Sequence, residues 1–131
     1  MRRMPTLPFW IAFVTTVLLL VASLTTGALR KRRIHVVLGP ATIVSLAIAI
    51  VLTEQLLRNY TFVPEELAFH LVFAKAGGLL ALPVIATGIW LARSERARIY
   101  HRVAVILWVV SVLSATGTGL WMFSHGTLNA G

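Results

Sequence analysis

The segment TTGALRKRRIHVVL, residues 25–38, joins two long apolar runs through four consecutive basic residues. The apolar runs cover about residues 8–29 and 35–57. A similar segment, ATGIWLARSERARIYHRVAVIL, lies at residues 86–107, between apolar runs at about 67–92 and 102–123. At a rise of ~1.5 Å per residue, each run is long enough to cross a hydrocarbon core of ~30 Å as a helix. The sequence therefore predicts four transmembrane helices.

The connections between these predicted helices are short, and NYTFVPEE at residues 59–66 is typical of them. Short connections make consecutive helices antiparallel neighbours. In lipid the backbone polar groups must be satisfied within each segment, so helices are the expected form. We therefore expect an all-α, integral membrane, up-down four-helix bundle that forms one domain over residues 1–131. The shared order of Thr-Gly, arginines and histidine in both halves indicates either a tandem two-helix repeat or convergence on one charge pattern.

The composition of the chain excludes several classes of protein. It has 131 residues, of which 58% are hydrophobic and only 12% charged, with a mean hydropathy of +0.87. Ordinary soluble domains carry about 25% charged residues. The net charge of +8 is concentrated in two connections, as in a membrane topology signal, so nucleic acid is not an expected partner. The absence of cysteine excludes disulfides and thiolate metal sites.

The distribution of charge also predicts the orientation. Arginines and a lysine fill the first connection and arginines the third, whereas Glu65 and Glu66 lie in the middle one. The positive-inside rule then places the first and third connections in the cytoplasm and both termini outside a bacterial-type plasma membrane. Arg2 and Arg3 oppose this assignment but are outnumbered. The first apolar run exceeds the ~7–15 residues of a signal-peptide core, so we expect it to be retained as a span.

The four histidines lie near the ends of the predicted helices. His35 and His101 begin the second and fourth helices on the cytoplasmic side, whereas His70 and His125 lie towards the outer side. In a sequential antiparallel bundle the second and fourth helices are diagonal. His35 and His101 are therefore predicted to bind one haem iron from opposite faces, with His70 as an outer ligand, joined by His125. The alternative is that these histidines only anchor helix ends at the membrane interface.

A stripe of small residues shares one face of the third predicted helix with His70. Its members recur at helical spacing: Ala74, Gly77, Gly78, Ala81 and Gly88. This stripe indicates either close packing of small residues between helices or a flat slot for a planar macrocycle. Lys75, on the same helix, is expected to meet Glu54 or a cofactor carboxylate, or to extend its amine to the outer surface.

Copper is an alternative cofactor, because imidazole also suits copper. Its candidate ligands are His70, His125 and Met122. Hydrolytic and phosphoryl-transfer enzymes are not expected, because the chain has no aspartate, no G-x-S-x-G motif and no phosphate-binding loop. An electron carrier or an assembly factor is favoured over an enzyme.

The segment from FHLVFAKAGG to LWMF, residues 69–123, carries a familiar order of motifs. A histidine begins one span, Thr-Gly-x-Trp ends it, arginines follow, and a His-Arg pair begins the next span. In these features the chain resembles, over about residues 67–123, the YozB/CtaM-type four-helix membrane proteins, which are connected with maturation of haem-copper cytochrome oxidases. The resemblance implies His35, His70 and His101 as functional residues, although His35-Val36 departs from the His-Arg of that family. A wider likeness to cytochrome b561-type bundles implies haem b.

These observations lead to one principal expectation and two alternatives. The principal expectation is a haem-binding protein of respiratory oxidase assembly or transmembrane electron transfer, with the lipid bilayer and oxidase subunits as partners. One alternative is a cofactor-free accessory subunit that packs its small-residue faces against oxidase helices. The other is a copper carrier on the outer face. A homo-oligomer is compatible with each of them.

Overall fold

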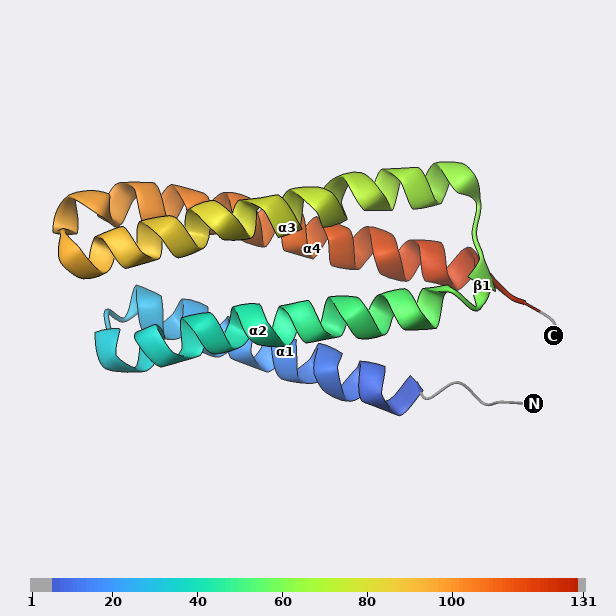
Figure 1. Cartoon of the computed structure of the whole chain (residues 1–131), viewed down its shortest axis with the longest axis horizontal. Helices are drawn as coiled ribbons and strands as arrows, with labels where there is room; N and C mark the ends of the chain where they lie inside the picture. Colours follow the sequence, from blue (N-terminus) through green and yellow to red (C-terminus); the bar gives the residue numbers. More distant parts are fainter. Residues whose placement is uncertain (1–5, 130–131) are drawn as a thin grey trace. The chain divides into compact units, whose positions relative to one another are not determined.

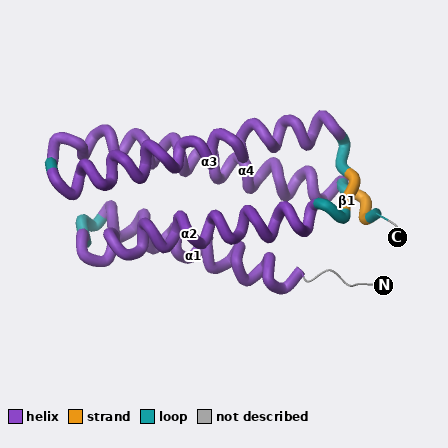
Figure 2. The backbone as a smooth tube through the Cα atoms, viewed as in Figure 1, coloured by secondary structure: helices purple, strands orange, loops and turns teal. Residues whose placement is uncertain are grey.

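A computed structural model describes residues 6–129 of the chain, and almost all of them are helical (Figures 1 and 2). The four long helices are α1 (Thr6–Ala28), α2 (Arg32–Leu57), α3 (Pro64–Arg93) and α4 (Arg98–His125). The short elements are the 3-10 helix η1 (Glu95–Ala97) and the strands β1 (Tyr60–Thr61) and β2 (Thr127–Leu128), which form a two-stranded ladder. The predicted all-α class with four helices is confirmed.

All four helices are long and apolar enough to cross a membrane. They contain 23 to 30 residues, which corresponds to lengths of ~35–45 Å. Large aliphatic side chains on each helix are exposed, as for Leu18 at 65% and Leu79 at 68%. Exposed apolar surface on this scale is incompatible with water but suits lipid. The chain is a multi-pass membrane protein.

The chain divides into two compact units, and each contains one antiparallel pair of helices. In the first, the N-terminal hairpin, α1 packs against α2 (Figure 1). In the second, the C-terminal hairpin, α3 packs against α4, with η1 in the turn between them. Each hairpin has its own buried contacts.

Three helices begin about one turn earlier than predicted. Arg32 and Arg98 are the first residues of α2 and α4, so part of each basic cluster is helical. α3 begins at Pro64, because proline suits the first helical position, where its missing N–H is not needed. Glu65 and Glu66 therefore lie in the first turn of α3, where the helix dipole stabilises their carboxylates.

The turn of the N-terminal hairpin ends α1 with a left-handed residue. Arg30 has a φ of 56°. The Lys31 N–H donates to Thr26 O at 2.9 Å, and the Arg30 N–H donates to Gly27 O at 3.2 Å. This pair of bonds is the Schellman motif, in which glycine usually occupies the left-handed position. The turn reverses the chain within three residues and thereby pairs α2 with α1.

Small and polar residues form part of the contact between the helices of each hairpin. In the N-terminal hairpin, the hydroxyls of Thr16 and Ser45 are hydrogen-bonded at 2.7 Å. In the C-terminal hairpin, a Cβ on Gly77 would lie 3.4 Å from Val112 Cγ2. Gly77 therefore lies in the contact between α3 and α4, as the packing interpretation of the small-residue stripe predicts at this position. Gly78, by contrast, has no described atom in contact range.

Candidate functional site

His35 lies in the first turn of α2, and its ring contacts α1. A Cβ on Gly27 would lie only 3.0 Å from His35 Cε1, so the imidazole rests directly on the glycine backbone. The ring Nδ1 lies 2.9 Å from the backbone oxygen of Ser23. Because a carbonyl oxygen only accepts, Nδ1 carries the proton of this bond. The hydroxyl of Thr26 donates to the same oxygen at 3.0 Å.

His101 has the corresponding position at the start of α4. Its ring lies against Gly88 of α3, where a Cβ would be 3.3 Å from His101 Cε1. His101 Nδ1 is 3.0 Å from Thr87 Oγ1. The Thr87 hydroxyl in turn donates to the backbone oxygen of Pro83 at 2.6 Å. The imidazole is therefore linked through a hydroxyl to the backbone of α3.

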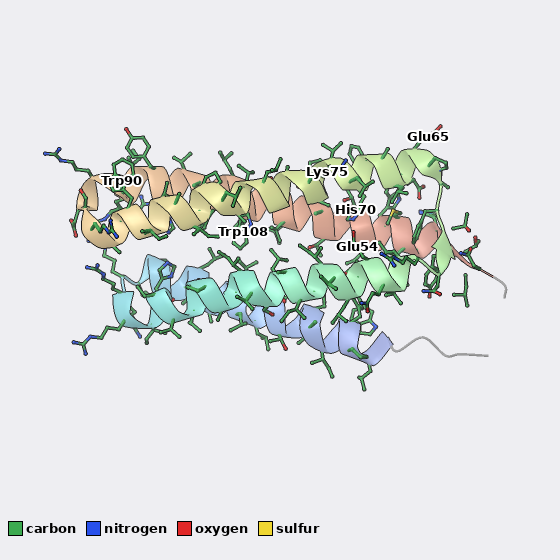
Figure 3. All side chains as sticks on the ribbon, in the orientation of Figure 1. Glu54, Glu65, His70, Lys75, Trp90 and Trp108 are labelled. Carbon is green, nitrogen blue, oxygen red and sulfur yellow. The ribbon has the colours of Figure 1, made fainter. Side chains whose placement is uncertain are left out.

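His70 lies at the other end of the C-terminal hairpin, between α3 and α4 (Figure 3). Its ring rests on Gly119 of α4, where a Cβ would be 3.0 Å from His70 Cε1. Its Nδ1 is 3.1 Å from Thr118 Oγ1, which donates to Ser114 O at 2.7 Å. Here the histidine comes from the first helix of the hairpin and the Thr-Gly pair from the second.

These three sites share one arrangement, which we call the histidine seat. A Thr-Gly dipeptide on one helix receives the imidazole from the paired helix, and the ring lies over the glycine. Nδ1 is hydrogen-bonded either to the threonine hydroxyl or to a carbonyl that also accepts from that hydroxyl. The seats combine Gly27 with His35, Gly88 with His101, and Gly119 with His70. Glycine permits the close approach because it has no side chain. Threonine inside a helix directs its hydroxyl proton to a carbonyl of the preceding turn, so its oxygen can accept.

The structure thus brings the three histidines with predicted cofactor roles into seats, each within a single hairpin. His70 and Gly88, which seats His101, are separated by 18 residues of α3, or ~27 Å along the helix axis. The two seats of the C-terminal hairpin therefore lie near opposite ends of the span. His35 and His101 belong to different hairpins, and their shared coordination of one iron stays a prediction.

His125 differs from the other three histidines. It is the last residue of α4, it is exposed, and its Nδ1 lies 3.0 Å from Trp121 O on its own helix. The carboxylate of Glu66 approaches to 3.8 Å through Oε1. The other oxygen, Glu66 Oε2, is buried without a hydrogen-bond partner among the described residues. Among the glycines of residues 6–129, none lies against the His125 ring.

Copper binding by His70, His125 and Met122 stays a prediction. Within residues 6–129, no group of three or more histidine or glutamate side chains is close enough to hold a metal ion. Met122 is 1% exposed and belongs to the buried interior. Glu66 and His125 provide a pair only. Lys75 is exposed on α3 (Figure 3), which agrees with the alternative in which its amine extends to the membrane surface.

Sequence reasoning identified the histidines but assigned no role to the threonines that hold them. The available signal was the repetition of Thr-Gly, which begins at residues 26, 87, 116 and 118. The dipeptide Thr116-Gly117 has no histidine, and Gly117 meets no described atom within 4 Å. Comparison of the chain with protein-family models, curated proteins and solved structures finds no match.

Proposed function

We propose that this multi-pass membrane protein binds haem through the imidazoles of His35, His70 and His101. The histidine seat is the observation that carries this proposal. Each of these rings is half-buried, rests on a glycine, and has Nδ1 hydrogen-bonded inside its own hairpin. Histidines that bind metals almost always donate their other ring N–H to a carbonyl or a similar acceptor. A histidine that only anchors a helix end needs neither the glycine nor the bond.

The residues near the seats fit haem better than an isolated metal ion. Imidazole is a common axial ligand of haem iron, and the chain contains no cysteine as a competing thiolate ligand. A haem needs only one or two protein ligands, whereas a zinc ion is held by three or four. Arginines near the start of α2 and α4, Arg33 and Arg102 among them, suit the propionate groups, because guanidinium binds carboxylate in a bidentate manner.

Bound haem would supply one-electron redox chemistry, and the protein would hold and orient the imidazoles. From the resemblance over about residues 67–123, we extend the proposal to a role in respiratory oxidase maturation or transmembrane electron transfer. Oxidase subunits are the corresponding partners, and a bacterial plasma membrane with both basic turns in the cytoplasm is the corresponding location. This part of the proposal rests on the resemblance and on the positive-inside rule.

The visible spectrum of the purified protein, together with metal quantification, tests the proposal. The protein is expressed with haem supplementation and purified in detergent. A Soret band and iron in at least half-stoichiometric amount are expected. The absence of both would contradict haem binding and leave the cofactor-free accessory subunit as the better account. Copper without iron would instead favour the copper carrier.

A further inference from the structure

The hydroxyl of Thr118 has one proton, and its hydrogen bonds show where that proton points. Thr118 Oγ1 lies 2.7 Å from Ser114 O and 3.2 Å from Ala115 O, and both carbonyls can only accept. The proton is therefore directed to the backbone of α4. The oxygen then faces His70 Nδ1, at 3.1 Å, as an acceptor. For this contact to be a hydrogen bond, Nδ1 must carry the hydrogen.

Thr87 repeats this geometry for His101. Its hydroxyl donates to Pro83 O at 2.6 Å, with Val84 O at 3.3 Å, and its oxygen lies 3.0 Å from His101 Nδ1. In the N-terminal hairpin the acceptor for His35 Nδ1 is the Ser23 carbonyl itself. A carbonyl has no proton to donate, so it selects the same protonated nitrogen. All three seats therefore favour a proton on Nδ1. Two of them do so through a threonine hydroxyl whose proton is used elsewhere, and the third does so through a backbone carbonyl.

We propose that Thr118 and Thr87 are positioning residues that fix the Nδ1–H tautomer of His70 and His101, so that Nε2 carries the lone pair and is the ligand atom. The identity of the bound group rests on the proposed function, whereas the tautomer follows from the hydrogen bonds alone. A neutral ring with its lone pair on a defined nitrogen binds a metal centre without first losing a proton. Its N–H bond to an acceptor also orients the ring and raises the basicity of the ligand atom.

The tautomer can be measured on the ligand-free protein by ¹⁵N NMR of the histidine side chains, at a pH where the rings are neutral. A ring nitrogen that carries a proton and one that carries a lone pair differ strongly in chemical shift. We expect protonated Nδ1 for His70 and His101 in the wild type. Thr118→Val, which removes the hydroxyl but keeps the shape, should shift His70 towards Nε2–H, and Thr118→Ser should restore Nδ1–H. Thr87→Val should have the same effect on His101.

Thr116→Val is the matched control, because the Thr116 hydroxyl donates to Val112 O on its own helix and seats no histidine. It should leave both ring tautomers unchanged. An Nε2–H tautomer in the wild type, or an Nδ1–H tautomer that survives both valine substitutions, would overturn the proposal. If one valine variant does not fold, the other variant and the serine substitution still give the result.

Haem loading gives a second, separate readout. Removal of an outer-shell partner typically reduces metal-centre affinity about 10–100-fold. We expect Thr118→Val to weaken haem retention at His70 by a factor in this range, with recovery in Thr118→Ser. Equal retention in wild type and Thr118→Val would overturn the positioning role. If neither the wild type nor any variant binds haem, the proposed function fails. The ¹⁵N NMR measurement on the ligand-free protein still tests the tautomers independently.

Discussion

At the scale of single residues, the sequence predicted which histidines matter but not which Thr-Gly dipeptides hold them. Histidines in an apolar chain are few, so their positions alone made them candidates. The seats were harder to identify, because Thr116-Gly117 and Thr118-Gly119 are the same dipeptide two residues apart. Two residues correspond to ~200° of rotation around a helix, so only one of them faces α3. The rotation of α4 within its hairpin is a tertiary property that the local sequence does not contain.

Gly119→Ala tests the seat of His70 directly. The added Cβ would lie 3.0 Å from His70 Cε1, so the ring must shift by a few tenths of an ångström. Overpacking of this kind typically costs about 1–3 kcal/mol. We therefore expect a lower free energy of unfolding than for Gly117→Ala, measured by denaturant titration in detergent micelles, because both variants gain the helix propensity of alanine and only Gly119→Ala crowds the ring.

Gly117→Ala is the matched control for this change, because nothing lies within 4 Å of the site. Alanine favours helix over glycine by up to ~1 kcal/mol, so this variant should be neutral or more stable. Equal effects of the two substitutions would mean that the close approach of His70 to Gly119 does not exist in the folded protein.

At the scale of elements, the apolar runs predicted the four helices, whereas the ends of the helices were predicted less well. Arginine is a good helix former, so α2 and α4 extend back into their basic clusters. A proline at the first helical position moved the start of α3 to Pro64. The left-handed Arg30 could not be expected from its side chain, because glycine usually fills that position. Its conformation follows from closure of the hairpin.

Arg30→Gly should stabilise the N-terminal hairpin. A residue with a side chain at a φ of 56° is strained, and glycine relieves this strain. We expect Arg30→Gly to be more stable than Arg30→Ala by about 1 kcal/mol, in line with the cost of the left-handed region. Both substitutions remove the same positive charge, so the difference between their unfolding free energies measures the cost of the left-handed backbone at residue 30. A more stable alanine variant would contradict the left-handed turn.

At the scale of the whole molecule, length and apolar composition were sufficient to predict a multi-pass membrane protein. The packing faces of the helices could not be predicted in the same way. Lipid is as apolar as leucine, so a helix face that contacts lipid and one that contacts another helix have similar composition. Gly77 is an example, because its place beside Val112 of α4 could not be derived from the sequence.

The membrane orientation can be measured with single cysteines, because the natural chain has none. Leu29→Cys in the first turn and Val63→Cys before α3 alter exposed residues and leave the charge unchanged. The positive-inside rule predicts that a membrane-impermeant thiol reagent labels the Val63→Cys variant in intact cells. The Leu29→Cys variant should react only after the membrane is opened. The opposite pattern would reverse the proposed orientation.

If the seated histidines bind haem, the Soret absorbance per protein must differ among matched histidine variants. His35→Ala, His70→Ala and His101→Ala each remove a seated ring, whereas His125→Ala removes a ring that has no seat. We expect the wild type and His125→Ala to have the same Soret band and iron content, and each of the other three variants to lose or shift the band. A wild-type protein without a Soret band, or a band that is unaffected in all three seated-histidine variants, would contradict this expectation.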